Sequence, residues 1–514
     1  MTSALVYQWL FLRLSPRFSL PFLAGAAAYF TILFPSLLAL AERSFEQVLP
    51  FPTGRLGGTI DALATTFVVA VLVAAGFLLA LWFGTWVYRL LPPRPAAWRR
   101  DRRGSSGPRA PAEPKPLGRY RRIGIILAGG GAKGAYQAGA LSAIHRFLTE
   151  REALGSVRMI AATSIGAWNA CFWLADLVGG EQPSVCETWW SRVRLSEIVT
   201  PTYYVPGLRN YVLSADPWRE AFRTLFTEDP AARERFLSHL TRPGADDTLH
   251  FYLTRTNVQR AHLEFSTNRE DLTGVENASG LRRPLVPPDR WVRARTIEDV
   301  EQAVFASMDL PPLFEYTRFG DELFEDGGVI ENLPIYFGTG IEKCDLLFVL
   351  PLNASFAAEI DQRSILDRLQ RLVTIRQGAL ERKALKDVYL YNELAVLRDR
   401  LQAGSLAPAR DRPQTSEAPA GSAAALREAA SVPIAERAAG RVHRPVQIFA
   451  VAPDEPLLID TVEFWRSAAA GRAFRLMEEH AGYELAKFDF DREPDWIRVA
   501  LIGPQGEVRY LEDF

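Results

Sequence analysis

Two short stretches of the chain carry residue types that could transfer an acyl group together. In the first, Ala162-Thr-Ser164-Ile-Gly166, a serine follows one apolar run and precedes another. A serine at a sharp strand-to-helix turn, with small residues two positions before and after it, is the pattern of a nucleophile elbow. Here Ala162 stands where glycine is typical, and Gly166 fits the pattern. Ser164 is therefore a candidate nucleophile, although ordinary polar turns also contain single serines of this kind.

A nucleophilic serine needs a base, and the candidate is Asp326. It stands at the end of an expected strand and is followed by Gly327 and Gly328, which let the backbone turn tightly. By itself an Asp-Gly-Gly sequence more often marks only a turn. The six histidines stand in no catalytic context that the sequence shows, at positions 145, 239, 250, 262, 443 and 480. A Ser–Asp dyad without histidine is the economical assignment.

The third feature is a glycine-rich loop at residues 129–134, between an apolar strand and an apolar helix. Such a loop presents backbone N–H groups to a negative charge. Gly129, Gly131 and Gly134 match the dinucleotide fingerprint, but its acid would have to come from the end of the following helix. The phosphate loop of nucleotide hydrolases is absent, because Lys133 precedes Gly134 and no Ser or Thr follows. The remaining interpretation is an oxyanion hole.

The elements that must position these groups alternate between strand and helix. Continuous apolar runs predict strands buried on both faces, and helical spacing of apolar residues predicts the segments between them. The expected strands are 125–128, 157–162, 251–258, 346–350 and 446–451, and the expected helices are 134–148, 168–175, 360–401 and 461–485. This alternation is typical of an α/β fold with a mainly parallel sheet.

Three motifs, in this order and at this spacing, make the chain resemble the patatin-like phospholipase family. They are the loop at 129–134, the Ser164 elbow with Gly166-Ala-Trp-Asn169-Ala170, and Asp326-Gly-Gly with Asn332-Leu-Pro334. The strand 251–258 and the stretch before the aspartate are also similar to that family's pattern, the latter in Ala306, Ser307, Pro311, Pro312 and Phe314. The resemblance covers roughly residues 120–355. It implies a three-layer α/β/α hydrolase with a mainly parallel central sheet.

The resemblance also implies a role for each site residue. Ser164 is the nucleophile and Asp326 the base, with no metal. The oxyanion loop comprises Gly129, Gly130, Gly131, Ala132, Lys133 and Gly134, and the N–H groups around Gly130, Gly131 and Ala132 hold the charge. Lys133 either adds positive charge there, faces solvent or contacts a phosphate. Ala162 and Gly166 support the elbow, and Gly327 and Gly328 support the aspartate.

The first 91 residues predict a transmembrane hairpin. Residues 20–41 and 63–88 are uncharged apolar runs, and each exceeds the ~18–20 residues that cross a bilayer. Arginines gather before the first run and after the second, so the positive-inside rule places both ends in the cytoplasm. Buried core helices are the alternative. With the resemblance, this predicts an integral protein of the bacterial inner membrane whose catalytic domain lies on the cytoplasmic side.

The rest of the chain divides by composition. After the hairpin (1–91) we expect a basic Pro/Gly-rich linker (92–118), the catalytic domain (119–355), an amphipathic helical segment (356–402), a flexible Ala/Pro-rich insertion (403–440) and a strand and helix that complete the catalytic domain (441–514). The amphipathic segment packs on the sheet by default, but it could also close over the site, dimerise or touch the membrane. Trp189 and Trp190 either cap the acyl site, form an interfacial patch of amphipathic rings, or pack in the interior.

Composition narrows the function further. The net charge of −1 indicates no partner, and three scattered cysteines without metal-ligand spacing predict neither a disulfide framework nor a metal site. We expect a membrane-anchored serine lipid acyl hydrolase, similar to a phospholipase A or lysophospholipase. Its substrate is a membrane phospholipid or another acyl-ester lipid, with no cofactor and no nucleic-acid partner, and no protein partner is indicated. The alternatives are a nucleotide-binding module, a catalytically inactive membrane scaffold, and an acyltransferase or esterase acting on another ester.

Overall fold

The computed structural model describes most of the chain in two units. The described residues are 23–37, 68–80, 82–83, 117–180, 183–202, 211–241, 248–272, 286–311, 313–353, 365–406, 445–490 and 497–511. The first unit comprises residues 1–97, 195–218 and 311–315, and the second comprises 98–194, 219–310 and 316–514. Every candidate site residue belongs to the second unit.

In the first unit, residues 23–37 and 68–80 are helical, and the first helix contains a π-helical turn, η1 (Tyr29–Leu33). The Tyr29 hydroxyl donates to the Leu72 carbonyl at 2.8 Å and joins the two helices. No helix within the described ranges is both long and apolar enough to cross a bilayer. The expected spans extend beyond the described residues at both ends, so the transmembrane hairpin stays a prediction. This unit also contains α8 (Leu195–Ile198) and the short pair β3 (Thr200–Pro201) and β4 (Leu213–Ser214).

The second unit is built on an 11-stranded sheet with the order β13-β12-β11-β10-β1-β2-β5-β6-β7, in which β9 pairs with β5 and β8 with β9. Its strands are β1 (Ile123–Leu127), β2 (Val157–Ala162), β5 (His250–Asn257), β6 (His262–Thr267), β7 (Trp291–Arg293), β8 (Thr317–Phe319), β9 (Glu322–Asp326), β10 (Leu346–Leu350), β11 (Gln447–Pro453), β12 (Ile497–Ile502) and β13 (Val508–Tyr510). The six strands from β12 to β5 are parallel, and antiparallel strands join both ends of this centre. The predicted α/β fold with a mainly parallel sheet is confirmed.

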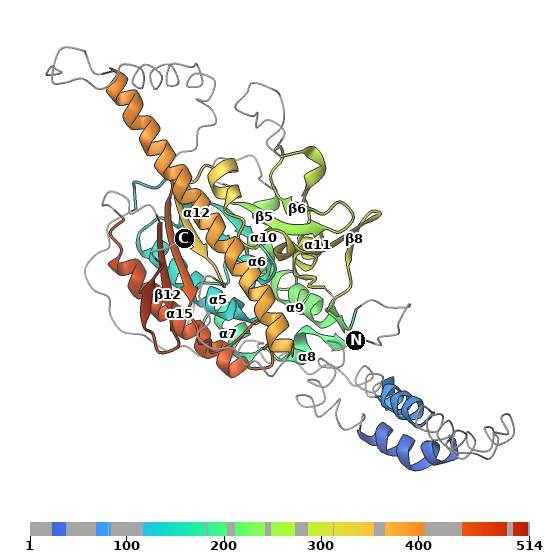
Figure 1. Cartoon of the computed structure of the whole chain (residues 1–514). Coiled ribbons are helices and arrows are strands. Elements are labelled where there is room, and N and C mark those ends of the chain that lie inside the picture. The colour runs from blue at the N-terminus through green and yellow to red at the C-terminus, as the bar shows by residue number, and fades with distance from the viewer. Residues whose placement is uncertain are drawn as a thin grey trace, which may run out of the picture. The chain divides into compact units, whose positions relative to one another are not determined.

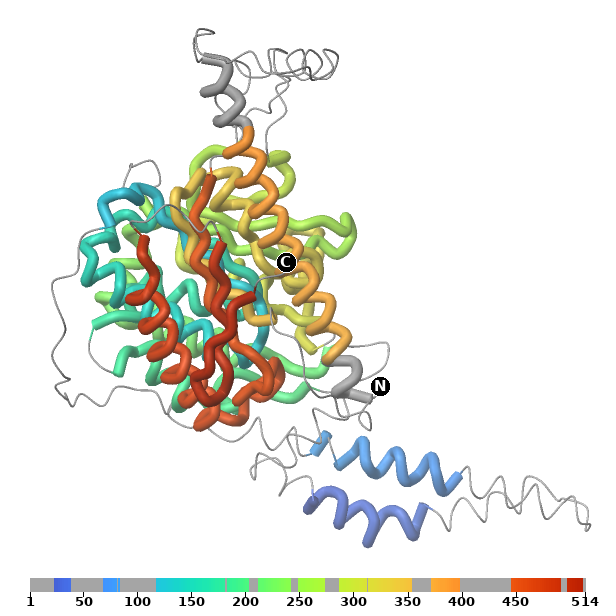
Figure 2. Tube along the Cα trace, turned by 60° about the vertical axis from the view of Figure 1, so that its left-hand side comes forward, coloured from blue at the N-terminus to red at the C-terminus, as the bar shows by residue number. Residues whose placement is uncertain are grey.

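Helices cover both faces of the sheet (Figure 1). The helices are α5 (Gly134–Glu150), α6 (Ile165–Leu174), α7 (Val185–Arg192), α9 (Asp216–Phe226), α10 (Pro230–Thr241), α11 (Ile297–Met308), α12 (Ile365–Leu406) and α15 (Ser467–Lys487). Strands β1 and β10 are buried at every position because apolar side chains point to both faces. On one face, α15 packs on α5, whose Phe147 ring lies 6.5 Å from that of Phe348 in β10. Figure 2 shows α15 and the last strands, in red, at one side of the unit.

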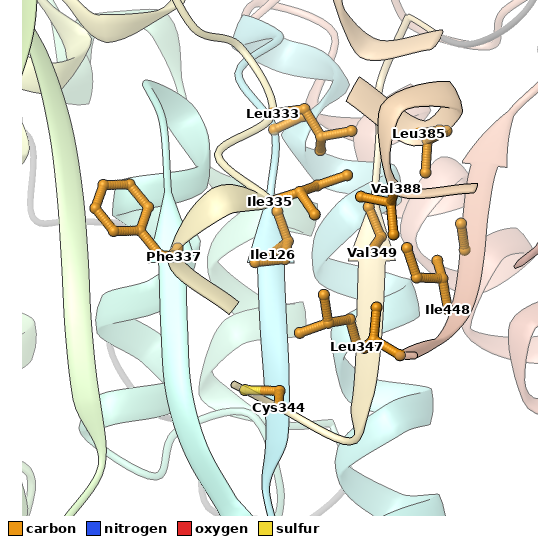
Figure 3. Close-up of a cluster of buried hydrophobic side chains, with 14 of the residues drawn as sticks. Ile126, Leu333, Ile335, Phe337, Cys344, Leu347, Val349, Leu385, Val388 and Ile448 are labelled. Carbon is orange, nitrogen blue, oxygen red and sulfur yellow. The ribbon is translucent and has the colours of Figure 1, made fainter. Parts of the chain in front are cut away.

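The other face is covered by α12 and by residues 333–341, which include a π-helical turn, η6 (Phe337–Ile341). Figure 3 shows Leu385 and Val388 of α12 beside Val349 and Ile448 of the sheet. The amphipathic segment therefore packs on the sheet, as expected by default, but only some of its apolar positions face the core. The side chains of Leu372, Leu390, Leu394 and Leu397 are exposed, whereas the buried positions are 378, 381, 385, 388, 392 and 395.

The site lies where the order of the strands reverses. The chain adds β2 and β5 on one side of β1, and later β10, β11 and β12 on the other. Ligands of open α/β sheets bind at the carboxyl ends of the strands beside such a reversal, here between β1 and β10. The glycine-rich loop leaves β1 at this edge, and residues 351–353 leave β10 there.

Several sequence expectations need correction. The last helix, α15, begins at Ser467 rather than at residue 461, because residues 461–466 form turns. Strands β6, β12 and β13 were not among the expected elements. The expected insertion at 403–440 lies almost wholly outside the described residues. Trp189 and Trp190 are fully buried and pack edge-to-face at 4.8 Å, so they belong to the interior rather than to a cap. All three cysteines are free and buried.

Candidate active site

Ser164 lies on a strained turn between β2 and α6. Its backbone has φ 55° and ψ −127°, a conformation that side-chain-bearing residues rarely adopt and that persists where the surroundings impose it. A Cβ at Gly166 would lie 2.6 Å from the Leu127 carbonyl oxygen and 2.9 Å from that of Ala128. The turn therefore needs glycine at this position. Ala162, the last residue of β2, is fully buried, so its methyl group fits the elbow without displacing the turn.

The structure brings Ser164 and Asp326 together. The Ser164 hydroxyl donates to Asp326 Oδ2 at 2.5 Å, and the backbone N–H of Gly328 donates to Oδ1 of the same carboxylate at 2.7 Å. Asp326 is buried at the end of β9, where its carbonyl accepts from Thr256 Oγ1 at 3.0 Å. Gly327 and Gly328 begin the short turn η5 (Gly327–Val329). This arrangement fixes both carboxylate oxygens and directs one of them at the serine.

A further serine, Ser307, supports the elbow through a hydrogen bond to its backbone. The Oγ of Ser307, a fully buried residue of α11, accepts the backbone N–H of Ser164 at 2.8 Å. Within the described part of the chain, the hydrogen-bond partners of Ser164 and Asp326 include no histidine. Among the described residues, the carboxylate that accepts from the Ser164 hydroxyl is that of Asp326.

The electrostatics of Asp326 suit a group that takes up a proton near neutrality. Burial raises the pKa of its carboxyl to about 7, against the hydrogen bonds from Ser164 and Gly328, which lower it. A second buried acid, Asp309, accepts the Asp326 N–H through its backbone carbonyl at 3.1 Å and the Thr317 hydroxyl through Oδ2. Burial also raises the pKa of Asp309 to about 7. A general base works best when its pKa lies near the working pH.

The glycine-rich loop leaves two N–H groups available. Those of Gly129 and Ala132 donate to the carbonyls of Asn332 (3.3 Å) and Thr461 (2.8 Å). Those of Lys133 and Gly134 donate within the loop, in the short turn η2 (Gly131–Lys133). Among the described residues, no acceptor pairs with the N–H of Gly130 or Gly131. The N–H of Ala132, which was expected among the oxyanion donors, already donates to the Thr461 carbonyl and anchors the loop.

The side chain of Lys133 is not exposed to solvent. It is 1% exposed, and its Nζ donates to Oδ1 of Asn353, the third residue after β10. Burial lowers the pKa of Lys133, while the acids Asp460, Glu381 and Glu455 raise it. Of the three roles open to Lys133, solvent exposure is excluded, and its hydrogen bond makes it a support of the loop.

Other polar side chains hold the same loop from inside the fold. Gln137 Nε2 donates to the carbonyls of Ala128 and Leu350 at 3.0 and 3.1 Å. Asn169 Nδ2 donates to the Gly134 carbonyl at 3.0 Å and to Gln137 Oε1 at 2.9 Å. Sequence reasoning missed the roles of Gln137, Asn353, Ser307 and Glu381. A signal existed for Asn353, because it follows β10 at the edge where the site had to lie, and for Glu381, because a carboxylate on the buried face of a helix needs partners.

The fold and this geometry define a class, an α/β protein with a serine–aspartate pair and a glycine loop at the carboxyl edge of its sheet. Residues 125–337 match the model of the patatin-like phospholipase family. The chain therefore contains a patatin-like phospholipase domain, which includes the elbow, the aspartate and the loop. The chain matches no curated protein. Among solved structures it is similar to VipD from Legionella pneumophila, with 13% identity and a TM-score of 0.33 over 71% of this chain and 67% of VipD.

Proposed function

We propose that this protein is a serine lipid acyl hydrolase that cleaves fatty-acyl esters with a Ser164–Asp326 dyad. The observation that carries the proposal is the 2.5 Å hydrogen bond from Ser164 Oγ to Asp326 Oδ2 inside a patatin-like phospholipase domain. A serine is a weak nucleophile until a neighbouring base accepts its proton, and this bond supplies the base. The family match favours a lipid ester, with membrane phospholipid or lysophospholipid as the substrate class.

The reaction has two half-reactions. In the first, Ser164 Oγ attacks the ester carbonyl carbon while Asp326 takes the hydroxyl proton, and the N–H groups of Gly130 and Gly131 stabilise the oxyanion. The tetrahedral intermediate expels the alcohol, which receives the proton from Asp326, and leaves an acyl-serine. In the second, Asp326 takes a proton from water, the resulting hydroxide attacks the acyl carbonyl, and the proton returns to Ser164 as the fatty acid leaves.

The direct test is fatty-acid release from mixed phospholipid vesicles by the detergent-purified full chain. We expect Ser164→Ala and Asp326→Asn each to lower kcat by at least about 10³-fold, since members of a catalytic unit are not replaceable singly. Ser238→Ala and Asp321→Asn are matched controls at exposed positions and should retain activity. A dyad variant that retains wild-type activity would contradict the mechanism.

Labelling with a fluorophosphonate separates the alternatives. If the wild type releases no fatty acid but is labelled at Ser164, the serine is reactive and the substrate is another ester or an acyl acceptor other than water. If it is neither active nor labelled, the inactive scaffold becomes the better explanation. Ala162 was the sequence feature that suggested this scaffold.

We also propose that residues 1–91 anchor the enzyme in the bacterial inner membrane, with the catalytic domain in the cytoplasm. The support is the sequence: the two uncharged apolar runs and the arginines that flank them. An anchored enzyme would lie beside a phospholipid substrate. The full chain is then expected to stay with the membrane fraction during alkaline carbonate extraction, and release into the supernatant would contradict an integral anchor. Protease accessibility of the catalytic domain only in inverted vesicles would establish its side.

A further inference from the structure

The helix α12 lies outside the residues that match the family, yet it places a carboxylate beneath the glycine loop. Glu381 is fully buried in this helix. Its Oε1 accepts from Asn332 Nδ2 at 2.5 Å and from Asn353 Nδ2 at 2.8 Å, and its Oε2 accepts the backbone N–H of Asn353 at 2.9 Å. One carboxylate thus holds two asparagines, one of which precedes β10 in the sequence and the other of which follows it.

The two asparagines converge on one peptide of the loop. Asn332 Nδ2 donates to the Gly129 carbonyl at 3.1 Å, and Asn353 Nδ2 donates to the same oxygen at 3.4 Å. The Asn332 backbone carbonyl accepts the Gly129 N–H at 3.3 Å. Both ends of residue 129 are therefore fixed by residues that Glu381 orients.

This arrangement determines where a free N–H points. In a trans peptide the carbonyl of one residue and the N–H of the next point in opposite directions. Holding the Gly129 oxygen on the Asn332 and Asn353 side therefore directs the Gly130 N–H to the other side. Gly130 carries one of the two loop N–H groups that have no acceptor among the described residues, and a Cβ at Gly129 would lie 2.9 Å from Ser164 Cβ. The loop peptide that Glu381 holds is next to the nucleophile.

The chemistry of the acceptor explains why the residue is a glutamate. An ionised carboxylate accepts on both oxygens, so it satisfies all three N–H donors at once. A glutamine would turn an NH₂ group toward at least one of those donors. Burial raises the pKa of Glu381, while the bonds from Asn353, the charge of Lys133 and the bond from Asn332 lower it. Lys133 also donates to Asn353 Oδ1, so a buried cation adjoins the same cluster.

We propose that Glu381 is a positioning residue for the oxyanion loop: through Asn332 and Asn353 it fixes the Gly129–Gly130 peptide so that the Gly130 N–H meets the developing oxyanion. This inference rests on the proposed acyl hydrolase function. It assigns part of the active site to a helix beyond residue 337, where the family match ends. Because the effect acts on charge that develops in the transition state, it should appear in kcat rather than in KM.

The test compares Glu381→Gln, Glu381→Ala and Glu393→Gln in the full chain, with vesicle hydrolysis as the assay. We expect kcat to fall about 10-fold in Glu381→Gln and about 100-fold in Glu381→Ala, with KM within about twofold, as when an oxyanion donor is misplaced. Glu393 is exposed on the same helix, and its variant should retain wild-type kcat. Wild-type kcat in a folded Glu381→Gln would overturn the proposal, and so would a change confined to KM.

A double-variant cycle with Asn332→Ala distinguishes positioning from general stability. Because part of the Glu381 effect runs through Asn332, the variant that combines Asn332→Ala with Glu381→Ala should lose less kcat than the product of the two single losses. Multiplied losses would overturn the proposal. Fluorophosphonate labelling of Ser164 should slow in parallel with hydrolysis, because phosphonylation uses the same N–H groups. A wild type that neither hydrolyses nor labels would refute the proposed function, whereas an active wild type with a fully active Glu381→Gln refutes only this inference.

Discussion

Two regions of the second unit contribute different kinds of residue to the candidate site. Residues 125–337 contain Ser164, Asp326 and the glycine loop, each in a short local motif. The region from 338 to 511 contains no candidate nucleophile or base, yet it supplies Asn353, Glu381 and the Thr461 carbonyl, and all three bond the loop or its supports. In the proposed mechanism, the first region carries the reacting groups, and the second holds the loop backbone that stabilises the oxyanion.

Residues beyond the family match bear on the candidate site through the orientation of its hydrogen-bond donors. Electrostatic stabilisation of an oxyanion depends on donors that are oriented before the reaction starts. In this chain, the orientation comes from residue 353, which follows strand β10, and from helix α12, and both come after the aspartate in the sequence. A chain that ended near residue 337 would keep the dyad residues but would lack Asn353, Glu381 and Thr461. The residues that support the candidate site therefore extend beyond the segment that matches the family model.

The largest predicted effect is a loss of folding stability when the packing of the second region on the sheet is disrupted. Leu385 lies one turn after Glu381 and packs fully buried against the sheet (Figure 3). Leu385→Ala should lower the free energy of unfolding by about 2–5 kcal/mol, because it leaves a cavity in the core. The matched control is Leu394→Ala on the same helix, whose side chain is 60% exposed and whose loss should cost less than about 0.5 kcal/mol. Guanidinium unfolding measures both, and equal losses would contradict this assignment of the buried face.

The activity should depend on pH through Asp326, which belongs to the first region. The pKa of Asp326 is raised to about 7 by burial, so below that pH the carboxyl is protonated and cannot accept the Ser164 proton. Activity should therefore increase with pH, about tenfold per unit below the pKa, and level off above it. From the high-pH plateau to pH 5 the expected fall in kcat/KM is about 100-fold, and from pH 7 to pH 5 it is about 50-fold.

The Glu381→Gln variant provides the control for that profile. If the second region only positions the loop, this variant should lower the plateau and keep the inflection near the wild-type pH. An inflection near the ordinary aspartate value would contradict the role of burial at Asp326. A variant inflection far from that of the wild type would show that α12 sets the base as well as the loop.

The sequence could predict the candidate serine, aspartate and glycine loop, which the structure brings together, because each belongs to a contiguous motif. The strained serine turn, the Asp-Gly-Gly turn and the glycine loop need only neighbours along the chain to be recognised. The roles of Asn353 and Glu381 depend on which face of α12 meets the sheet. Apolar spacing identified that face only in part, because Leu385 and Val388 are buried whereas Leu390 and Leu394 are exposed. Strand β6 was missed for a similar reason, since its sequence His-Leu-Glu-Phe-Ser-Thr carries buried polar residues that burial patterns do not anticipate.

The smallest predicted effect tests whether the first region also supports its own nucleophile. Ser307 Oγ accepts the Ser164 N–H at 2.8 Å and so holds an elbow whose φ is positive. Ser307→Ala leaves that N–H without its side-chain acceptor, which costs about 1 kcal/mol and should lower kcat about fivefold. Ser142→Ala is the matched control, because it removes a bond of similar length (3.0 Å to Glu478) from a buried serine on α5. A loss in Ser307→Ala that exceeds the loss in Glu381→Gln would reverse the division of labour, and the support of the site would then lie mainly within residues 125–337.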